Sequence, residues 1–177
     1  MGTLQIKKVT QSVENSPFDC GVESINEYVR HSYYPLIIQH AYAYSIASEG
    51  KVLGYYQVLF RDIELDKFPE QIADYSFDEH YLKLTALHIR YIAIDKKYQG
   101  RGIGTVVMKF IIKKCRELAT DWPVRVITLD ANVNLEKWYS GFDFQVMPSN
   151  IAGQEGVTTT MYLDCMRHSD ELERYSS

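Results

Sequence analysis

The sequence predicts a mixed α/β protein of the α+β kind, in which helices pack on a sheet. The first observation is the order of periodic segments: a strand, helices, three strands, a helix, a strand, a short helix and two strands. The second is an amphipathic helix between two apolar strands, a crossover that makes those strands parallel. The third is size, because 177 residues, 46% of them hydrophobic, can bury the core of one domain. We therefore expect one domain over residues 1–165 and a charged tail over residues 166–177.

Helical and strand periodicities alternate along the N-terminal part of the chain. Apolar residues recur at i, i+3 and i+4 after Glu23, the spacing of a helix with one buried face. We expect Pro35 to interrupt this helical region. Gly50 lies between two apolar-rich runs, as in a β-hairpin. The predicted elements are a strand at 4–10, a helix at 23–31, a short helix at 36–40, and hairpin strands at 42–48 and 52–60.

Residues 61–83 form a less regular and markedly acidic stretch. We expect an inserted loop with one helical turn near residues 69–75. Its acidic side chains would attract a cationic substrate if the loop borders the acceptor site, and they are otherwise an ordinary solvated surface. The acidic residues are Asp62, Glu64, Asp66, Glu70, Asp74, Asp78 and Glu79.

The rest of the chain carries the strongest helical pattern. Apolar residues keep helical spacing from Gly102 to Leu118. The run from Val124 to Leu129 is continuously apolar, which is typical of a strand buried on both faces. The predicted elements are a central strand at 84–94, a helix at 102–118, a strand at 124–129, a short helix at 134–140, and strands at 142–147 and 157–163.

Composition and charge disfavour several classes of protein. Cys20, Cys115 and Cys165 form neither a CxxC pair nor a zinc-type spacing, so we expect reduced thiols in a cytoplasmic protein and no metal site. No apolar run is long enough to span a bilayer, and the N-terminus lacks the apolar region of a signal peptide. A net charge of −4 argues against nucleic acid as the main partner, although it leaves room for a local basic patch.

The segment with the clearest chemical pattern is the turn Gln99-Gly100-Arg101-Gly102-Ile103-Gly104, which leads from the central strand into the long helix. The first N–H groups of a helix lack intrahelical acceptors, and the helix dipole adds partial positive charge there. Glycines let the backbone approach a phosphate, and Arg101 adds a fixed positive charge. The turn therefore predicts an anion site, although a tight connection with glycines for packing explains the turn alone equally well. A dinucleotide fingerprint and a P-loop are disfavoured, because position 107 is Val and no Gly-Lys-Ser/Thr follows.

Preceded by Ile92-Ala93-Ile94-Asp95, this Gln-x-x-Gly-x-Gly turn resembles the cofactor motif of the GNAT (Gcn5-related) N-acetyltransferase superfamily. The motif similarity covers residues 84–147 and includes Asn132 and Tyr139 at matching distances. The resemblance implies an acyl-CoA N-acyltransferase fold, with a mostly antiparallel sheet of six to seven strands, a splayed central parallel pair, and helices on both faces. It also implies that acetyl-CoA is the cofactor, that a primary amine attacks directly in a ternary complex, and that a homodimer is common in the family.

The resemblance assigns individual residues to the cofactor. Main-chain groups of the central strand would pair with the pantetheine arm, and those of residues 100–105 would hold the pyrophosphate. Asp143 stands where the family has Gly before Phe144, which predicts a positive φ there. The implied cofactor-binding residues are Ile92, Ala93, Ile94, Gln99, Gly100, Arg101, Gly102, Ile103, Gly104, Thr105 and Asn132.

Tyr139 and His88 are the candidate catalytic residues. The resemblance puts Tyr139 beside the thioester sulfur as a general acid, and a phenol can protonate a departing thiolate. An alkylammonium group must lose a proton before it attacks, and a neutral imidazole can accept one. His88 matches the strand position of the glutamate base in the histone-acetyltransferase branch. A packed aromatic and a core histidine are the alternatives, and Asp62 and Glu64 are rival bases.

The identity of the acceptor amine stays open at this point. The main expectation is a small cationic amine or a protein or peptide amine. The segment Phe18-Asp19-Cys20-Gly21 and the helix after it resemble the N-terminal signature of GNAT toxins from type II toxin–antitoxin pairs, which acetylate aminoacyl-tRNA. That branch has a basic tRNA-binding surface and an Arg where Tyr91 stands here, so tRNA acetylation is kept as the alternative. A non-catalytic module that binds acetyl-CoA is a further one.

Overall fold

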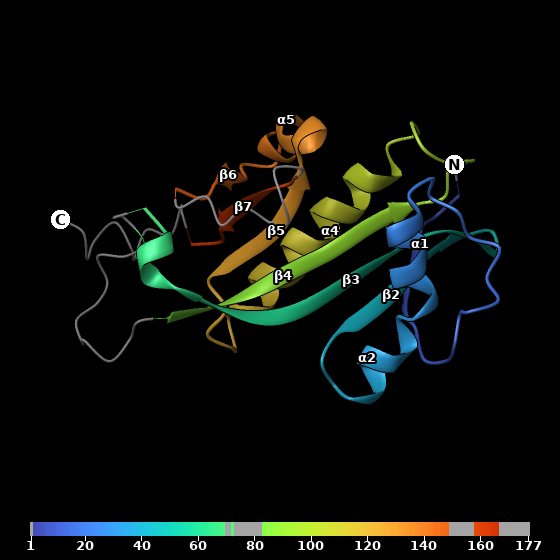
Figure 1. The fold of residues 1–177 in the computed structure, drawn as a ribbon, viewed down its shortest axis with the longest axis horizontal. Helices are drawn as coiled ribbons and strands as arrows, with labels where there is room; N and C mark the ends of the chain where they lie inside the picture. Colours follow the sequence, from blue (N-terminus) through green and yellow to red (C-terminus); the bar gives the residue numbers. More distant parts are fainter. Residues whose placement is uncertain (1, 70–71, 73–82, 149–157, 167–177) are drawn as a thin grey trace. The chain divides into compact units, whose positions relative to one another are not determined.

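The computed structural model describes residues 2–69, 72, 83–148 and 158–166. Its strands form one mixed sheet of seven, in the order β1-β2-β3-β4-β5-β7-β6 (Figure 1). The neighbours β4 (Lys83–Ile94) and β5 (Val126–Asn132) are parallel, and α4 (Ile103–Leu118) connects them. The predicted mixed sheet with a crossover helix is thus confirmed.

The chain divides into two compact units. Unit 1 comprises Met1–Leu59 and Ile89–Met108, and unit 2 comprises Phe60–His88 and Lys109–Ser177. The strands β3 (Lys51–Glu64) and β4 and the helix α4 each begin in one unit and end in the other.

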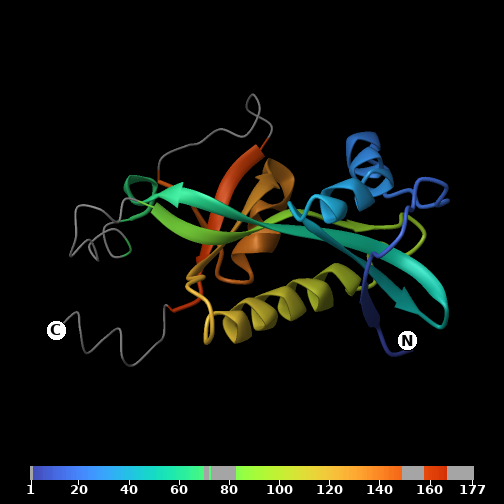
Figure 2. The ribbon, with the colours of Figure 1, turned by 90° about the horizontal axis from the view of Figure 1, so that it is seen from below.

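Unit 1 contains the N-terminal helices and an antiparallel set of strands. The hairpin turn between β2 and β3 has positive φ at Glu49 (51°) and Gly50 (75°), which matches the two-residue turn that best fits the twist of paired strands. In Figure 2 the two N-terminal helices lie on one face of these strands and the start of α4 lies on the other. The elements are β1 (Gln5–Lys8), α1 (Glu23–Arg30), α2 (Tyr33–Ile37) and β2 (Tyr42–Ser48), followed by the first parts of β3 and α4 and the end of β4.

The second helix differs from the prediction. It spans Tyr33–Ile37 and contains Pro35, which we expected to interrupt the helical region. Proline is tolerated there because N–H groups in the first turn of a helix have no helical acceptor to lose. The expectation of a start at Leu36 was therefore wrong.

The core of unit 1 joins segments that are distant in the sequence. Phe18 and Cys20 come from the loop before α1, Val29 from the helix itself, and Tyr91 and Ala93 from β4. The Phe18 ring meets the Tyr55 ring edge to face at 5.1 Å. The N-terminal loop is consequently part of the core of unit 1.

Unit 2 holds the other end of the sheet. Its core includes Ile63 and Phe68, with Ala86 from β4, Val126 from β5 and Tyr162 from β7. The elements wholly inside it are the 3₁₀ turn η1 (Leu65–Lys67), β5, the 3₁₀ turn η2 (Val133–Leu135), α5 (Glu136–Ser140), β6 (Gln145–Val146) and β7 (Thr158–Asp164). The β5–β7 and β7–β6 pairs are antiparallel.

Four predictions for this unit need correction or fall largely outside the described residues. The acidic stretch begins inside a strand, because β3 continues to Glu64. The strand expected at 142–147 is reduced to Gln145–Val146, since Asp143 has a φ of 68° and the chain turns before it pairs. The helical turn expected at 69–75 and the charged tail lie largely outside the described residues.

Cys115 and Cys165, far apart in the sequence, are free thiols with their sulfur atoms 3.6 Å apart.

Candidate active site

The turn before α4 has the backbone shape that an anion site requires. Gly100 and Gly102 have φ values of 72° and 76°, in the left-handed region that favours glycine. A Cβ built at either residue meets no atom within 4 Å. Glycine is therefore needed here for backbone conformation, and the space beside the turn is open. The turn leads directly into the N-terminus of a 16-residue helix.

Side chains of the turn are used to hold it in place. Nε2 of Gln99 donates to the carbonyl oxygens of Cys20 and Ile94, each at 2.9 Å. Nη2 of Arg101 donates to the Lys97 carbonyl oxygen at 3.0 Å. Gln99 and Arg101, both predicted to bind the cofactor, thus have structural contacts, and the Ile94 carbonyl is already engaged.

The N-terminal loop makes further contacts in the same region of unit 1. The Asp19 carboxylate pairs with Lys96 and accepts hydrogen bonds from the Gly21 N–H and the Asn26 amide. These donors, Lys96 first among them, hold the pKa of Asp19 well below its ordinary value. The Asn26 side chain also accepts from the Cys20 N–H at 2.9 Å. The Phe18–Gly21 signature therefore has a visible function, which is to fasten the N-terminal loop beside the turn.

The end of β4 approaches β3 unusually closely at Gly54. A Cβ at Gly54 would stand 2.4 Å from the Ala93 carbonyl oxygen and 2.9 Å from Cδ1 of Ile94. Only glycine fits there without a shift of the strand that carries Ile92, Ala93 and Ile94. No pattern in the sequence indicated this close approach.

Tyr139 lies on α5 in unit 2, within a cluster of aromatic rings. Its ring contacts Trp138 at 4.8 Å and Phe144 at 6.0 Å between centroids. Burial raises the pKa of the Tyr139 phenol to about 12. At neutral pH the hydroxyl accordingly keeps its proton, as a general acid must.

His88 is buried in β4, with both ring nitrogens near polar groups of unit 2. Nδ1 lies 3.0 Å from Oγ1 of Thr128, and Nε2 lies 3.9 Å from a carboxylate oxygen of Asp130. The other oxygen of Asp130 accepts a hydrogen bond from Thr160 at 2.8 Å. An imidazole beside a carboxylate can hold an additional proton, and the same contacts also suit a structural histidine. The rival base Asp62 accepts a hydrogen bond from Oγ1 of Thr85 at 3.0 Å.

Asn132 and Asp143 occupy special backbone positions in unit 2. The Asn132 side chain accepts from the Asn134 N–H at 3.0 Å and so caps η2. Asp143 has a φ of 68°, which confirms the positive φ expected where the family has glycine. Asparagine and aspartate tolerate that conformation better than most residues.

Unit 1 also contains a hollow of about 280 Å³ that the sequence did not indicate. The Arg90 guanidinium lies over the Tyr28 ring, 4.4 Å from its centroid. Gln57 is only 1% exposed, and its Nε2 has no hydrogen-bond partner among the described residues. The lining comes from α1 and its C-terminal cap, from α2, from β3 and from β4. The lining residues are Tyr28, His31, Tyr34, Pro35, Gln57 and Arg90.

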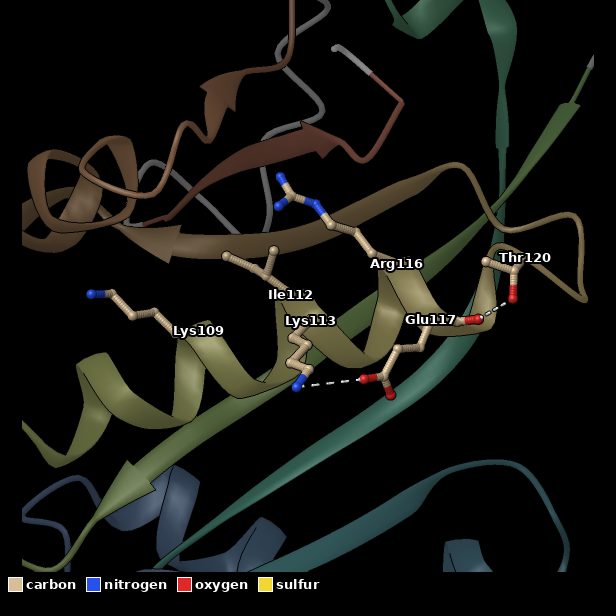
Figure 3. A pocket seen from close by; sticks show the side chains of 6 residues that line it. All are labelled: Lys109, Ile112, Lys113, Arg116, Glu117 and Thr120. Atoms are coloured by element: carbon tan, nitrogen blue, oxygen red, sulfur yellow. Dashed lines mark hydrogen bonds and ion pairs between the residues drawn. The ribbon is translucent and has the colours of Figure 1, made fainter. Parts of the chain in front are cut away.

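A second hollow, of about 530 Å³, runs along α4 in unit 2 (Figure 3). Lys113 bends toward Glu117, 3.8 Å away, while Lys109 and Arg116 extend away from that pair. Lys114 lies 2.7 Å from the same carboxylate. The hollow is lined by Lys109, Ile112, Lys113, Arg116, Glu117 and Thr120, so it is a local basic surface without an aromatic ring.

The described residues limit other kinds of site. They contain no group of three or more His, Cys, Asp and Glu residues arranged to hold a metal ion. Among the helices that the structure describes, none combines the length and the apolar character required to cross a membrane.

The family model, a relative in sequence and the similar solved structures all point to acetyltransferases. The acetyltransferase (GNAT) family model matches residues 10–144. The tRNA-acetylating toxin of Mycobacterium tuberculosis (strain ATCC 25618 / H37Rv) is 21% identical over 146 residues, which is 81% of this chain and 86% of the relative. The structure of AtaT complexed with acetyl-methionyl-tRNAfMet matches with a TM-score of 0.76 and 17% sequence identity. The match covers 99% of this chain and 100% of the AtaT chain.

Other solved structures agree with this assignment of the fold. A tyrosine-to-phenylalanine mutant of KacT matches with a TM-score of 0.75 and 17% sequence identity. The match covers 97% of this chain and 98% of the KacT chain. AtaTR bound with acetyl-CoA has a TM-score of 0.71 at 17% identity and covers 98% of both chains. The chain therefore belongs to the acetyltransferase (GNAT) family and is an N-acetyltransferase that uses acetyl-CoA.

Proposed function

We propose that this enzyme acetylates the α-amino group of aminoacyl-tRNA. The observation that carries the proposal is a likeness to the toxins along nearly the whole chain: AtaT with acetyl-methionyl-tRNAfMet covers 99% of it, and the tRNA-acetylating toxin covers 81%. The N-terminal signature on which the toxin resemblance rests supports it too, because Asp19 and Cys20 contact the segment that leads into α4.

The chemistry of the acceptor supports an α-amine over a lysine or a polyamine. An α-amino group has a pKa of about 7.7–8.0, whereas a lysine ammonium has a pKa of about 10.4. A much larger share of the α-amine is therefore neutral at pH 7 and needs only a weak base. Of the seven acidic residues that favoured a small cationic amine, Asp62, Glu64 and Asp66 are among the described residues and the other four lie outside them.

We infer that main-chain groups of the turn and of β4 hold acetyl-CoA, with Asn132 as a further contact. Two glycines with positive φ, open space beside each, and the helix N-terminus fit a pyrophosphate. When bound, acetyl-CoA supplies the acetyl group as a thioester that the amine attacks. Gln99 and Arg101 act on this site by shaping the turn, since their side chains contact main-chain carbonyl groups.

Two side chains are assigned the proton transfers. His88 accepts the proton that the attacking amine loses, and Asp130, 3.9 Å from Nε2, favours the imidazolium that forms. Tyr139 donates its hydroxyl proton to the departing sulfur, and its raised pKa of about 12 keeps that proton in place beforehand. Both roles are predictions.

The function is tested by incubating the protein with labelled acetyl-CoA and a panel of charged tRNAs, spermidine and a lysine peptide. We expect label on aminoacyl-tRNA, and Tyr139→Phe should lower kcat by about 100-fold, within the usual range for a general acid. The affinity for acetyl-CoA should stay within about twofold, since the phenol acts on the leaving group alone. Tyr42→Phe, which removes a hydroxyl from a 36% exposed ring in unit 1, is the matched control. Transfer to spermidine or the peptide with none to any charged tRNA would refute the proposal.

A further inference from the structure

We propose that the hollow of unit 1 lined by Tyr28, Tyr34, Gln57 and Arg90 is a subsite for the 3′-terminal nucleoside of the tRNA. The inference rests on the proposed function and specifies which part of the substrate is recognised and by which residues. Four observations on the described residues support it: exposed aromatic rings, a cation without an ion pair, a buried donor without an acceptor, and the size of the hollow.

The aromatic rings of the hollow are unusually accessible. Tyr28 is 45% exposed and Tyr34 is 66% exposed. Single-stranded bases bind proteins by stacking on such rings and on arginine guanidinium planes. Arg90 lies over the Tyr28 ring, which also stacks on the Tyr91 ring with 6.4 Å between centroids. The hollow therefore presents the guanidinium, the exposed part of this stack and the Tyr34 ring to a base.

The charge of the hollow favours a nucleotide over a cationic amine. Among the described residues Arg90 forms no ion pair, whereas Arg30 on α1 is paired with both Glu23 and Glu27. His31, also in the lining, lies 3.3 Å from Glu27. The charge of Arg90 would repel a polyamine and attract a phosphate or the acceptor edge of a base.

The side-chain Nε2 of Gln57 is a buried hydrogen-bond donor, and none of the described residues accepts a hydrogen bond from it. A buried N–H group without a partner destabilises the folded state unless something accepts from it. Bases carry ring nitrogens and carbonyl oxygens that accept such bonds. Gln57 lines the hollow, so a base bound there is the partner that we assign to its amide.

The volume of the hollow restricts what can enter. A volume of about 280 Å³ lies just below the range of about 300–1,000 Å³ for ligand pockets. One planar group fits, but a duplex does not. The unpaired 3′ end is the part of an aminoacyl-tRNA with this chemistry, and it carries the amine.

The adenine of acetyl-CoA has the same chemistry, so the experiment must separate the two sources. We would measure kcat and KM for aminoacyl-tRNA and, separately, for acetyl-CoA. The variants are Tyr28→Leu, Arg90→Met and Gln57→Leu, with Lys113→Met as a matched control that removes a surface cation from the hollow of Figure 3. A second acceptor, aminoacyl-adenosine, retains the terminal nucleoside and lacks the rest of the tRNA.

The expected result is a KM for aminoacyl-tRNA raised about tenfold by each of the three variants, in line with the loss of one stacking or charged contact. The same increase should appear with aminoacyl-adenosine, and the KM for acetyl-CoA should not change. Gln57→Leu should leave the unfolding midpoint unchanged or higher, because it removes a buried donor that lacks an acceptor among the described residues. Lys113→Met should have no effect with aminoacyl-adenosine.

Each failure has its own signature. If the wild type acetylates aminoacyl-tRNA and the three variants keep its KM, the subsite is wrong and the proposed function stands. A raised KM for acetyl-CoA instead would assign the hollow to the cofactor. If the wild type acetylates no aminoacyl-tRNA, the proposed function fails, and the subsite fails with it.

Discussion

The turn Gln99–Gly104 and the hollow of unit 1 satisfy their polar groups in opposite ways. In the turn, the Gln99 and Arg101 side chains are bonded to main-chain carbonyl groups of the same unit. In the hollow, Gln57 has a donor without a partner, and Arg90 has no ion pair, among the residues that the structure describes. The turn is thus held together by contacts within the protein, whereas the hollow leaves polar groups available to a ligand.

This difference suits the two ligands that we propose for these sites. A site made of main-chain groups recognises a ligand that all members of a family share, because any sequence with the right glycines can build it. A site made of side chains from several elements can change with one substitution. Under the proposed assignment, the turn accounts for the use of acetyl-CoA, and the hollow is where a preference for one acceptor would arise.

Among substitutions near the proposed acetyl-CoA site, we expect the largest effect on stability and on acetyl-CoA affinity at Gly54. Gly54→Ala should destabilise the protein by about 1–3 kcal/mol, the usual cost of overpacking. The added Cβ would stand 2.4 Å from the Ala93 carbonyl oxygen, so β4 must shift. The affinity for acetyl-CoA, measured by titration calorimetry, should fall while the KM for aminoacyl-tRNA changes less. Unaltered stability and acetyl-CoA affinity would show that β4 tolerates the shift.

Two glycines of nearly equal φ can separate the contribution of the turn to acetyl-CoA binding from the effect of backbone strain on stability. Gly102 and Gly50 have φ values of 76° and 75°, and a Cβ added at either one would meet no atom within 4 Å. Gly102→Ala and Gly50→Ala should each cost about 1 kcal/mol of unfolding free energy. Only Gly102→Ala should raise the KM for acetyl-CoA, by about tenfold, which is the loss of about 1.4 kcal/mol of binding. An equal KM in the two variants would contradict a pyrophosphate site at the turn.

The smallest effect is expected from the Asp19–Lys96 pair, which is partly exposed. Because Lys96, Gly21 and Asn26 lower the pKa of Asp19 in the folded state, the carboxylate contributes stability above its unfolded pKa of about 3.9. That contribution disappears as the pH falls through the folded pKa. The pKa of Lys96 is raised, so its contribution is present below its ordinary pKa of about 10.4 and disappears as the pH rises further.

Urea unfolding of the wild type and Asp19→Asn at several pH values measures this effect. The difference in midpoint should be constant between about pH 5 and pH 8 and shrink below about pH 4. A difference that does not vary with pH would mean that Asp19 acts through its neutral hydrogen bonds alone.

Features that depend on local pattern could be predicted from the sequence. The helix Gly102–Leu118, observed as Ile103–Leu118, combines apolar residues at helical spacing with glycines before it. The hairpin around Gly50 was predicted from residue type, and the positive φ of Asp143 was predicted from the glycine that the family has at this position. The conformation of the turn Gln99–Gly104 was predictable because it depends on consecutive residues.

Features that join distant segments could not be predicted in this way. The hollow combines α1, α2, β3 and β4, and nothing in the neighbourhood of Gln57 marks it as a buried donor. The requirement for Gly54 comes from the carbonyl of Ala93 on the next strand. Pro35 was misjudged because its effect depends on its position in the helix, and that position is set by packing.

The contact between Gln99 and Cys20 has a consequence for the synthesis of the chain. These residues are 79 positions apart, and Lys96 and Asp19 are 77 positions apart. Contacts of such long sequence separation close a large loop and form late in folding. During translation the N-terminal loop leaves the ribosome long before the turn that it fastens. The protein therefore fastens the turn Gln99–Gly104 only after more than half of the chain has been made.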